Sequence, residues 1–391
     1  MGQSQVLPYL QGLSRQNFQF TILSFEKRDR FEKEKDIVKS AIRGANIKWV
    51  PMRFTSKPPV FSKIYDRWKL KQMALKLYRK QRFDLVHCRS YVAAEIGLNF
   101  KKKFNTKFLF DMRGFWADEK VDNGQWDQTL FYYRLIYKYY KKKEEKFLLN
   151  ADSIISLTQS ARDFLLSKPE YRHLSIEVIP CCADLDHFDY QKISSEDIHS
   201  LKNRLHIPAT AKVITYLGSA GGWYLINEMF SFCKMLIDQK PEYVMLVLTK
   251  DNIKKVREEA LSTGIPNDKI FVTYSNREKL PQFLALSTCG VFFIRNTSSK
   301  IASSPSKHAE LMGMGIPIIC NDIGDTGYIV NKTKTGIIVD DFSEYSFQDA
   351  ISQIDRLEKI DRRYIQNCSR EIFDLNIGIQ QYLDIYNRIM N

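Results

Sequence analysis

Strand-sized apolar segments alternate with helical patterns along this chain of 391 residues, in two consecutive series. The first series holds the strand patterns Phe18–Phe25, Ile47–Val50, Phe83–Cys88, Lys107–Met112, Ser153–Leu157 and Ile176–Pro180. The second series holds Lys212–Leu217, Tyr243–Thr249, Lys269–Tyr274, Gly290–Arg295, Pro317–Asn321 and Gly336–Val339. Strands that alternate with helices build parallel sheets covered on both faces. The sequence therefore predicts an α/β fold with two Rossmann-like, doubly wound domains, joined near Cys181–Ile207, where the pattern breaks.

The first series begins without a strand. A doubly wound domain normally opens with a strand in the middle of its sheet. Here Gln5–Ser14 already carries its apolar residues on one helical face. Two explanations stay open, a start codon further upstream or a sheet that lacks its central strand, and we favour the first. We expect the first domain of this chain to lack its opening strand.

The charge of the chain is concentrated in its first part. The net charge is +14, and residues 1–150 hold 32 Lys and Arg against 15 Asp and Glu, whereas the remainder holds 27 against 30. Such asymmetry points to a polyanionic surface, namely a membrane, a nucleic acid or an anionic glycan, although a basic face also keeps a protein soluble. No recognition helix or RNA-binding signature accompanies it, and we expect no nucleic-acid partner.

Two basic helical patterns also carry many aromatic residues. Ser62–Arg82 contains Tyr65, Trp68 and Tyr78 among lysines and arginines, and Thr129–Asn150 contains five tyrosines before Lys141–Lys143. This composition suits a helix lying on anionic lipid, and it also suits stacking on nucleic acid or burial in the domain core. We expect the first domain to contact an anionic membrane surface.

Other features indicate the compartment. No apolar run approaches the roughly 20 residues that span a bilayer, and Met1–Leu10 does not resemble a signal peptide. The seven cysteines are odd in number and lack metal-ligand spacing, as in reduced intracellular proteins. We expect a cytoplasmic protein, peripheral on the inner face of the plasma membrane.

The most informative motif is SSPSKHAELMGMGIPII at Ser303–Ile319. Ser304 can cap a helix and Pro305 fits its first position, so the free N–H groups and partial positive charge of the helix can hold a phosphate. Lys307 adds a full positive charge, and Glu310 follows on the same face, where it can accept hydrogen bonds from a pair of sugar hydroxyls. An ordinary capped helix with a Lys–Glu surface pair explains these residues equally well.

The pattern Ser-Pro-Ser-Lys-x-x-Glu-x-x-x-x-Gly-x-Pro-Ile-Ile resembles the donor-site signature of retaining GT-B glycosyltransferases, in the large family of bacterial mannosyl- and glucosyltransferases called glycosyl transferases group 1. Further segments are similar in the same order along nearly the whole chain: Gln3–Leu10, Val178–Pro180, Asp184–Phe188 and Gly336–Val339. The resemblance implies that residues 1–183 form an acceptor-side domain and residues 184–371 a nucleotide-sugar domain. It also implies that the last helix, residues 372–391, packs back on the first domain.

The resemblance assigns a role to each matching residue. Glu310 would bind the ribose hydroxyls, and Lys307 would approach the diphosphate with Ser304 and Ser306. Gly218, Ser219, Gly221 and Gly222 would line the phosphates. Tyr274 and Ser275 would lie near the base, while Gly2 and Gln3 would face the donor from the first domain.

The chain departs from the family pattern at three places. Ala302 stands where the family usually has a second Glu that contacts the transferred sugar. The loop Gly218–Tyr224 lacks the usual Arg and Lys, so Arg295, Lys300 or Lys307 must neutralise the diphosphate. Asp111 and Arg113 stand where the family often has a His-Asp pair after the fourth strand. They are our candidates for the acceptor side, and an ordinary structural ion pair explains them equally well.

The resemblance implies a hexosyltransferase that moves a sugar from a nucleoside diphosphate sugar to a saccharide or lipid-linked saccharide. No bound cofactor and no metal are expected, and Asp184-Leu185-Asp186 is interpreted as structural because it lies in the crossing between the domains. Two alternatives remain: a non-catalytic sugar-nucleotide or glycan-binding protein, and a sugar-nucleotide epimerase of the same architecture. The sequence does not specify the sugar, the base, the acceptor, the linkage or the oligomeric state.

Overall fold

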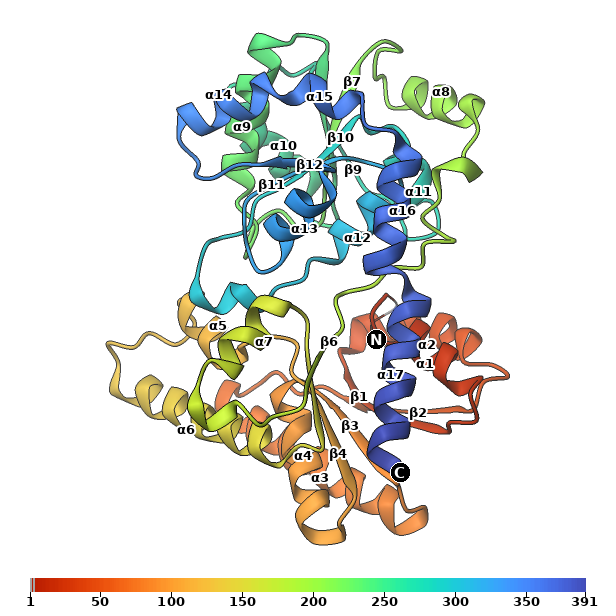
Figure 1. Cartoon of the computed structure of the whole chain (residues 1–391), viewed down its shortest axis with the longest axis vertical. Helices are drawn as coiled ribbons and strands as arrows, with labels where there is room; N and C mark the ends of the chain where they lie inside the picture. Colours follow the sequence, from red (N-terminus) through yellow and green to blue (C-terminus); the bar gives the residue numbers. More distant parts are fainter. Residues whose placement is uncertain (1, 3) are drawn as a thin grey trace.

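The chain folds into two α/β domains stacked one above the other (Figure 1). The structure, a computed structural model, describes residue 2 and residues 4–391. Both domains use parallel strands with helices on their faces, so the predicted pair of doubly wound domains is confirmed.

The second domain is built on one six-stranded parallel sheet in the order β12-β11-β10-β7-β8-β9. Its strands are β7 (Lys212–Leu217), β8 (Tyr243–Leu248), β9 (Ile270–Thr273), β10 (Cys289–Phe292), β11 (Ile318–Cys320) and β12 (Gly336–Ile338). Every residue of β8 is buried, as expected of an apolar strand covered on both faces. The helices are α8 (Ser195–Arg204), α9 (Ile226–Gln239), α10 (Ile253–Ser262), α11 (Leu280–Leu284), α12 (Ser306–Gly313), α13 (Thr326–Thr333), α14 (Glu344–Ser352), α15 (Ile354–Glu358) and α16 (Arg362–Phe373).

The first domain has two separate parallel sheets. One pairs β1 (Phe20–Glu26) with β2 (Ile47–Arg53), and the other has the order β3-β4-β5-β6. The strands of the second are β3 (Leu85–Arg89), β4 (Lys107–Asp111), β5 (Ser153–Ser156) and β6 (Ile176–Val178). The helices are α1 (Leu7–Ser14), α2 (Arg28–Ala41), α3 (Pro59–Lys80), α4 (Ser90–Phe104), α5 (Trp116–Asp122), α6 (Phe131–Asn150) and α7 (Gln159–Leu166). Within the described residues no strand precedes α1, in agreement with the expected lack of an opening strand.

The last helix, α17 (Leu375–Met390), returns to the first domain and lies along it (Figure 1). Its Tyr382 and Ile389 share a buried cluster with Tyr9 and Leu13 of α1. At the crossing, Leu375 N donates to Ala183 O at 3.0 Å and Ala183 N donates to Phe373 O at 2.9 Å. The chain therefore passes between the domains twice, side by side.

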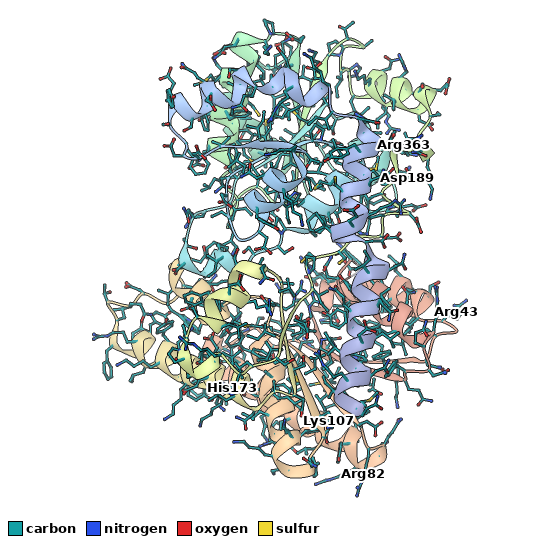
Figure 2. All side chains as sticks on the ribbon, in the orientation of Figure 1. Arg43, Arg82, Lys107, His173, Asp189 and Arg363 are labelled. Atoms are coloured by element: carbon teal, nitrogen blue, oxygen red, sulfur yellow. The ribbon has the colours of Figure 1, made fainter. Side chains whose placement is uncertain are left out.

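The outer surface of the first domain carries much of the basic charge. Arg43 and Arg82 are exposed and project away from the body of the domain (Figure 2). None of the described helices has the length and apolar character that a membrane span requires.

Candidate functional site

A cavity of about 1470 Å³ lies between the two domains and extends into the first. From the second domain it is lined by residues that follow the carboxyl ends of β7, β8 and β9: Gly218, Ser219, Thr249, Lys250, Tyr274, Ser275 and Arg277. Glu310 completes that wall, and Gly2, His87 and Arg89 lie on the side of the first domain. Ligands of open α/β sheets bind at this end of the strands.

Helix α12 carries the two most informative residues of the motif, Lys307 and Glu310, and both are buried. The predicted cap was wrong, because the N-cap residue is Pro305 and no side chain caps the helix. The hydroxyl of Ser304 instead accepts a hydrogen bond from Cys181 N at 3.1 Å. Ser304 therefore ties the helix to the segment that crosses between the domains, and Ser306 becomes the first helical residue.

Lys307 is held in an unusual environment for a lysine. Its Nζ has no hydrogen-bond partner among the described residues and lies 3.4 Å from the ring centroid of Tyr224 and 4.2 Å from that of Tyr216. Burial lowers the pKa of Lys307 well below its ordinary value, and Glu310 opposes this shift only in part. A buried ammonium that only aromatic faces stabilise can gain strongly from an anionic ligand.

The Gly218 loop lies directly beside that ammonium. An ideal Cβ at Gly218 would lie 2.7 Å from Lys307 Nζ, and the backbone φ of +134° also favours glycine. Any side chain here would push the lysine ammonium aside. The structure thus brings Gly218 and Lys307 together, as expected for two parts of one phosphate site.

Glu310 faces the same cavity and is paired with a residue that the sequence did not single out. Its Oε1 accepts a hydrogen bond from Arg277 Nη1 at 2.8 Å. Burial raises the pKa of Glu310, and the Arg277 guanidinium works against this rise. The sequence could have identified Arg277, because it is a basic residue shortly after the end of a strand, and such residues lie at the edge of the sheet where ligands bind.

Tyr274 and Ser275 also line the cavity. Tyr274 is 49% exposed, so its aromatic side chain can stack on a base. Gly221 and Gly222 lie outside the described lining, and their positive φ angles of 116° and 70° form the turn that follows Gly218. Of the two expected first-domain residues, Gly2 lines the cavity, whereas Gln3 lies outside the described residues.

None of the three candidates for diphosphate neutralisation is among the described residues that line the cavity, although Lys307 lies beside Gly218, which does line it. Arg295 is exposed, and its backbone N donates to Trp223 O at 2.9 Å. Lys300 is buried and donates to Glu119 Oε1 of the first domain at 2.7 Å. Its Nζ also lies 3.8 Å from the centroid of the Trp223 ring. Lys300 therefore connects the two domains, and Lys307 is the lysine that faces the Gly218 loop.

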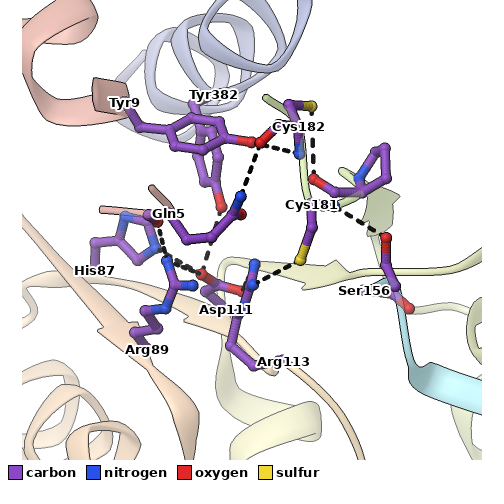
Figure 3. Close-up of polar contacts among 12 residues, drawn as sticks. Gln5, Tyr9, His87, Arg89, Asp111, Arg113, Ser156, Cys181, Cys182 and Tyr382 are labelled. Atoms are coloured by element: carbon purple, nitrogen blue, oxygen red, sulfur yellow. Dashed lines mark hydrogen bonds and ion pairs between the residues drawn. The ribbon is translucent and has the colours of Figure 1, made fainter. Parts of the chain in front are cut away.

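Asp111 and Arg113 belong to a charged cluster in the first domain (Figure 3). Asp111 is fully buried; its Oδ2 lies 3.6 Å from His87 Nε2 and 4.0 Å from Arg89 Nη1, and its Oδ1 lies 4.0 Å from Arg113 Nη1. Burial opposes ionisation, yet Arg113, His87 and Arg89 together keep the pKa of Asp111 below its ordinary value. Of these four residues, His87 and Arg89 line the cavity, whereas Asp111 and Arg113 do not.

The same cluster is attached to the crossing segment and to α17. Arg113 Nη2 donates to Cys181 Sγ at 3.2 Å, and Tyr382 OH donates to Asp111 Oδ2 at 3.4 Å (Figure 3). Gln5 Nε2 donates to Cys182 O at 2.8 Å. His87 thus lines the cavity and also belongs to a polar network that reaches the two segments by which the chain crosses between the domains.

The described residues contain no group of three or more His, Cys, Asp or Glu side chains placed to hold a metal ion. Asp184 of the Asp-x-Asp sequence accepts hydrogen bonds from the backbone N of Asp186 at 3.2 Å and of His187 at 3.1 Å. These contacts agree with the structural interpretation of that sequence.

Two doubly wound domains that face each other across a ligand cavity define the GT-B class of architecture. Residues 4–187 match Glycosyltransferase Family 4, and residues 197–370 match Glycosyl transferases group 1. The two matches and the architecture together support a group 1 glycosyltransferase. No curated protein matches the chain.

Solved structures share this fold along almost the whole chain. Sucrose-phosphate synthase from Thermosynechococcus elongatus is 15% identical, with a TM-score of 0.65 over 95% of this chain and 99% of that chain. HepE from Anabaena, in complex with UDP and glucose, is 13% identical, with a TM-score of 0.66 over 94% and 99%. A putative UDP-N-acetylglucosamine 2-epimerase from Listeria monocytogenes is 12% identical, with a TM-score of 0.59 over 97% and 91%. Identities this low show the fold alone.

Proposed function

We propose that this protein is a retaining glycosyltransferase that moves a hexose-type sugar from a nucleoside diphosphate sugar to a saccharide or lipid-linked saccharide. The acceptor belongs to the synthesis of a cell-surface polysaccharide or glycolipid. One observation carries the proposal: the buried ammonium of Lys307, which has no hydrogen-bond partner among the described residues, lies beside Gly218, and Gly218 and Glu310 line the same cavity.

The donor is expected to place its diphosphate between Lys307 and Gly218. There the lysine charge and the free N–H groups at the start of α12 stabilise the negative charge that develops as the diphosphate leaves. Glu310, fixed by Arg277, accepts hydrogen bonds from the ribose hydroxyls, and the Tyr274 ring stacks on the base. Because HepE binds UDP and glucose, UDP-glucose is the first donor to test.

The acceptor is expected to enter from the side of His87 and Arg89. In a retaining transfer its hydroxyl attacks the anomeric carbon from the face that the diphosphate leaves. Asp111 keeps His87 and Arg89 oriented toward the cavity through its carboxylate. The ion pair between Lys300 and Glu119 holds the domains together while water is excluded.

Donor turnover tests this function. Purified protein is incubated with UDP-glucose and other sugar nucleotides, with and without extracted membrane lipid, and released nucleoside diphosphate is measured. We expect release that rises with the acceptor lipid and falls at least about 100-fold in Glu310→Ala. The anomeric configuration of the product, measured by NMR, shows whether the transfer retains the configuration of the donor sugar. An epimerase would convert the donor without any acceptor, and a binding protein would bind the donor without turnover.

A membrane surface on the first domain supports a lipid-linked acceptor. Exposed apolar residues follow one side of α6 at Phe131, Leu135 and Tyr139, and one side of α3 at Phe61 and Trp68. Arg67 of α3 donates to Tyr139 OH at 3.1 Å, so the two helices lie next to each other. Exposed basic residues flank them, namely Lys63, Arg134, Lys138 and Lys142. Helices of this kind bind anionic lipid at the interface, and we propose a cytoplasmic protein that lies on the inner face of the plasma membrane.

Vesicle binding tests the membrane contact separately from turnover. Sedimentation with vesicles rich in phosphatidylglycerol is compared with sedimentation with neutral phosphatidylcholine vesicles. We expect binding only to the anionic vesicles, and a loss of about tenfold in a Trp68→Ala, Phe131→Ala double variant, because buried apolar area drives insertion. Tyr345→Ala is the matched control, since Tyr345 is 80% exposed in the second domain. Equal binding by the control and the double variant would contradict the contact.

A further inference from the structure

Two guanidinium groups share one carboxylate at the ligand-binding edge of the first domain. Arg89 ends β3 and Asp111 ends β4, and Arg113 follows two residues later. The Asp111 carboxylate lies between the two arginines, 4.0 Å from the Nη1 atom of each (Figure 3). One negative charge therefore balances two positive charges. We call Gln5, His87, Arg89, Asp111 and Arg113 the arginine cluster.

Arg89 presents the excess positive charge to the cavity. It lines the cavity, and its Nη1 donates a hydrogen bond to the backbone O of Gln5. The distance of 4.0 Å to Asp111 is too long for a hydrogen bond. Burial, followed by the neighbouring charge of Arg113, lowers the pKa of Arg89. An anionic ligand beside Arg89 would offset both effects, because it supplies the charge that the shared carboxylate does not.

The arginine cluster also contains polar atoms without a partner. Among the described residues, eight buried side-chain N and O atoms form no hydrogen bond, and three of them are Gln5 Oε1, His87 Nε2 and Asp111 Oδ1. Gln5 and His87 line the cavity together with Arg89. Buried polar atoms require partners, and sugar hydroxyl groups can pair with an amide oxygen and with an imidazole nitrogen. The cluster therefore suits a ligand that carries hydroxyl groups next to its negative charge.

The backbone that carries the two arginines is unusual for residues with side chains. Arg113 has a φ of +61°, and Ser90, which directly follows Arg89, has a φ of +68°. This left-handed conformation is unfavourable for residues other than glycine, and residues held in it often lie at ligand sites. Here both lie at the ends of two paired strands, β3 and β4. The backbone is thus a second, independent indication of a binding site.

A single residue connects the arginine cluster to the donor side of the cavity. Cys181 N donates to Ser304 Oγ at 3.1 Å, and Cys181 Sγ accepts a hydrogen bond from Arg113 Nη2 at 3.2 Å. Ser304 directly precedes the cap of α12, the helix that carries Lys307. A negative charge held by Arg89 is therefore expected to lie on the reacting sugar of the acceptor, and not far along an attached lipid.

We propose that the arginine cluster binds an acceptor sugar that itself carries an oxyanion, a carboxylate or a phosphate, and that Arg89 contacts this oxyanion. The inference rests on the proposed function and narrows its acceptor to an acidic saccharide. Gln5 and His87 bind hydroxyl groups of the same sugar, while Arg113 engages Asp111 and so leaves Arg89 available. A guanidinium suits this role because its planar donors pair with two oxygens of a carboxylate or phosphate at once.

Equilibrium binding of small sugars tests the proposal without any use of turnover. Ligand-observed NMR at constant ionic strength gives the dissociation constants of methyl glucuronide, glucose 1-phosphate and the uncharged methyl glucoside. We expect at least one acidic sugar to bind at least about tenfold more tightly than methyl glucoside, because a charge-assisted hydrogen bond is added to the same hydroxyl contacts. The tighter acidic sugar identifies the oxyanion as carboxylate or phosphate. If neither binds more tightly than methyl glucoside, the proposal is overturned.

A repeat of the measurement with added UDP separates the arginine cluster from the donor phosphate site. We expect the preference for the acidic sugar to remain. A preference that disappears with UDP would place the oxyanion at Lys307 and would also overturn the proposal. Absence of donor turnover with every acceptor would count against the transferase, but it would leave these binding constants unchanged.

Substitution of Arg89 assigns the preference to one side chain. In Arg89→Gln we expect a preference of about twofold or less, with methyl glucoside bound as in the wild type, because only the charge-assisted contact is lost. Arg89→Lys should keep part of the preference, since it retains the charge without the planar donors. The matched control is Arg82→Gln, because Arg82 is an exposed arginine at the end of the first domain that points away from the second (Figure 2).

Two results with these variants would contradict the role of Arg89. One is a full preference in Arg89→Gln, and the other is an equal loss of preference in Arg89→Gln and Arg82→Gln. If Arg89→Gln does not fold, Arg89→Lys decides, and an undiminished preference in that variant would overturn the contact.

Discussion

Lys307 Nζ lies 3.4 Å from the centroid of the Tyr224 ring and has no hydrogen-bond partner in the described part of the chain. The contact stabilises a positive charge from one side and leaves its other side facing the Gly218 loop. Removing the charge is therefore expected to have two separate effects, one on binding of an anionic ligand and one on the stability of the folded chain.

Replacing this charged side chain with an apolar one is expected to lower activity and to leave the stability of the fold equal or higher. In Lys307→Met we expect donor turnover to fall by about 100-fold or more, because the leaving diphosphate loses its nearest cation. The midpoint of thermal unfolding is expected to stay equal or rise, because a buried, partnerless ammonium is costly. Lys332→Met, which removes an exposed lysine 5.7 Å from the Tyr328 ring, is the control. A variant that lost stability but kept turnover would contradict this role.

The lowered pKa of Lys307 makes stability depend on alkaline pH. Between its folded pKa and the ordinary value of 10.5, the unfolded chain binds a proton that the folded chain does not. Stability from this residue therefore rises with pH in that interval, and below the folded pKa the penalty is complete and constant. Urea unfolding from pH 7 to 10 should show the wild type approaching Lys307→Met as the pH rises. A constant difference across that range would count against the shift.

Arg277 is expected to set the acidic limit of activity through Glu310. Burial raises the pKa of Glu310 and the guanidinium lowers it, so Arg277→Met should raise it further. If the ionised carboxylate binds the ribose, activity is lost as the pH falls through this pKa. The acidic limb of kcat/KM should then move to higher pH in Arg277→Met and be absent in Glu310→Gln. If the acidic limb does not move, it reports the titration of another group.

The ion pair between Lys300 and Glu119 is expected to act between the domains. If it holds them together, Lys300→Met and Glu119→Gln should lower turnover to the same extent, and the double variant should be no worse than either. Such non-additivity corresponds to a coupling of about 0.5–3 kcal/mol. If Lys300 instead bound the diphosphate, its loss would be the more severe and the two effects would add. Steady-state kinetics of the four proteins decide between them.

Asp111 is expected to stabilise the first domain at neutral pH. Asp111→Asn leaves the guanidinium groups of Arg89 and Arg113 without their carboxylate, at a cost of about 3–5 kcal/mol. Its pKa is lower in the folded chain than the ordinary 3.8, so this contribution is present above pH 3.8 and is lost as the pH falls through the folded pKa. Urea unfolding at pH 7 and near pH 3 should show the difference shrinking. Asp268→Asn, at an exposed position, should show none.

The strands could be predicted because apolar residues dominate them. The predicted strand Lys212–Leu217 agrees with the structure in both bounds. The helix α2 was missed because Arg28–Ala41 is rich in charge and buries only Val38 among the residues of the helix. Such a helix has almost no apolar face, which is the feature that periodicity detects.

The candidate site was predictable where one segment carries it and not where distant segments meet. Lys307 and Glu310 share a helix, so their common face followed from their spacing. The pairing of Glu310 with Arg277 and that of Lys300 with Glu119 join separate parts of the chain. Spacing along the sequence carries no information on these contacts, and the Ser304 hydroxyl was misassigned for the same reason, since its partner is Cys181.

The position of α17 bears on the order in which the chain can fold during synthesis. Tyr9 and Leu13 at the beginning of the chain share their buried cluster with Tyr382 and Ile389 at its end. A ribosome releases these last residues only after the whole second domain has emerged, and domains synthesised first generally fold first. Here that order is reversed: the second domain has its complete sheet before the first can close its core. The segment around Tyr9 and Leu13 must therefore wait, incompletely packed, until α17 is synthesised.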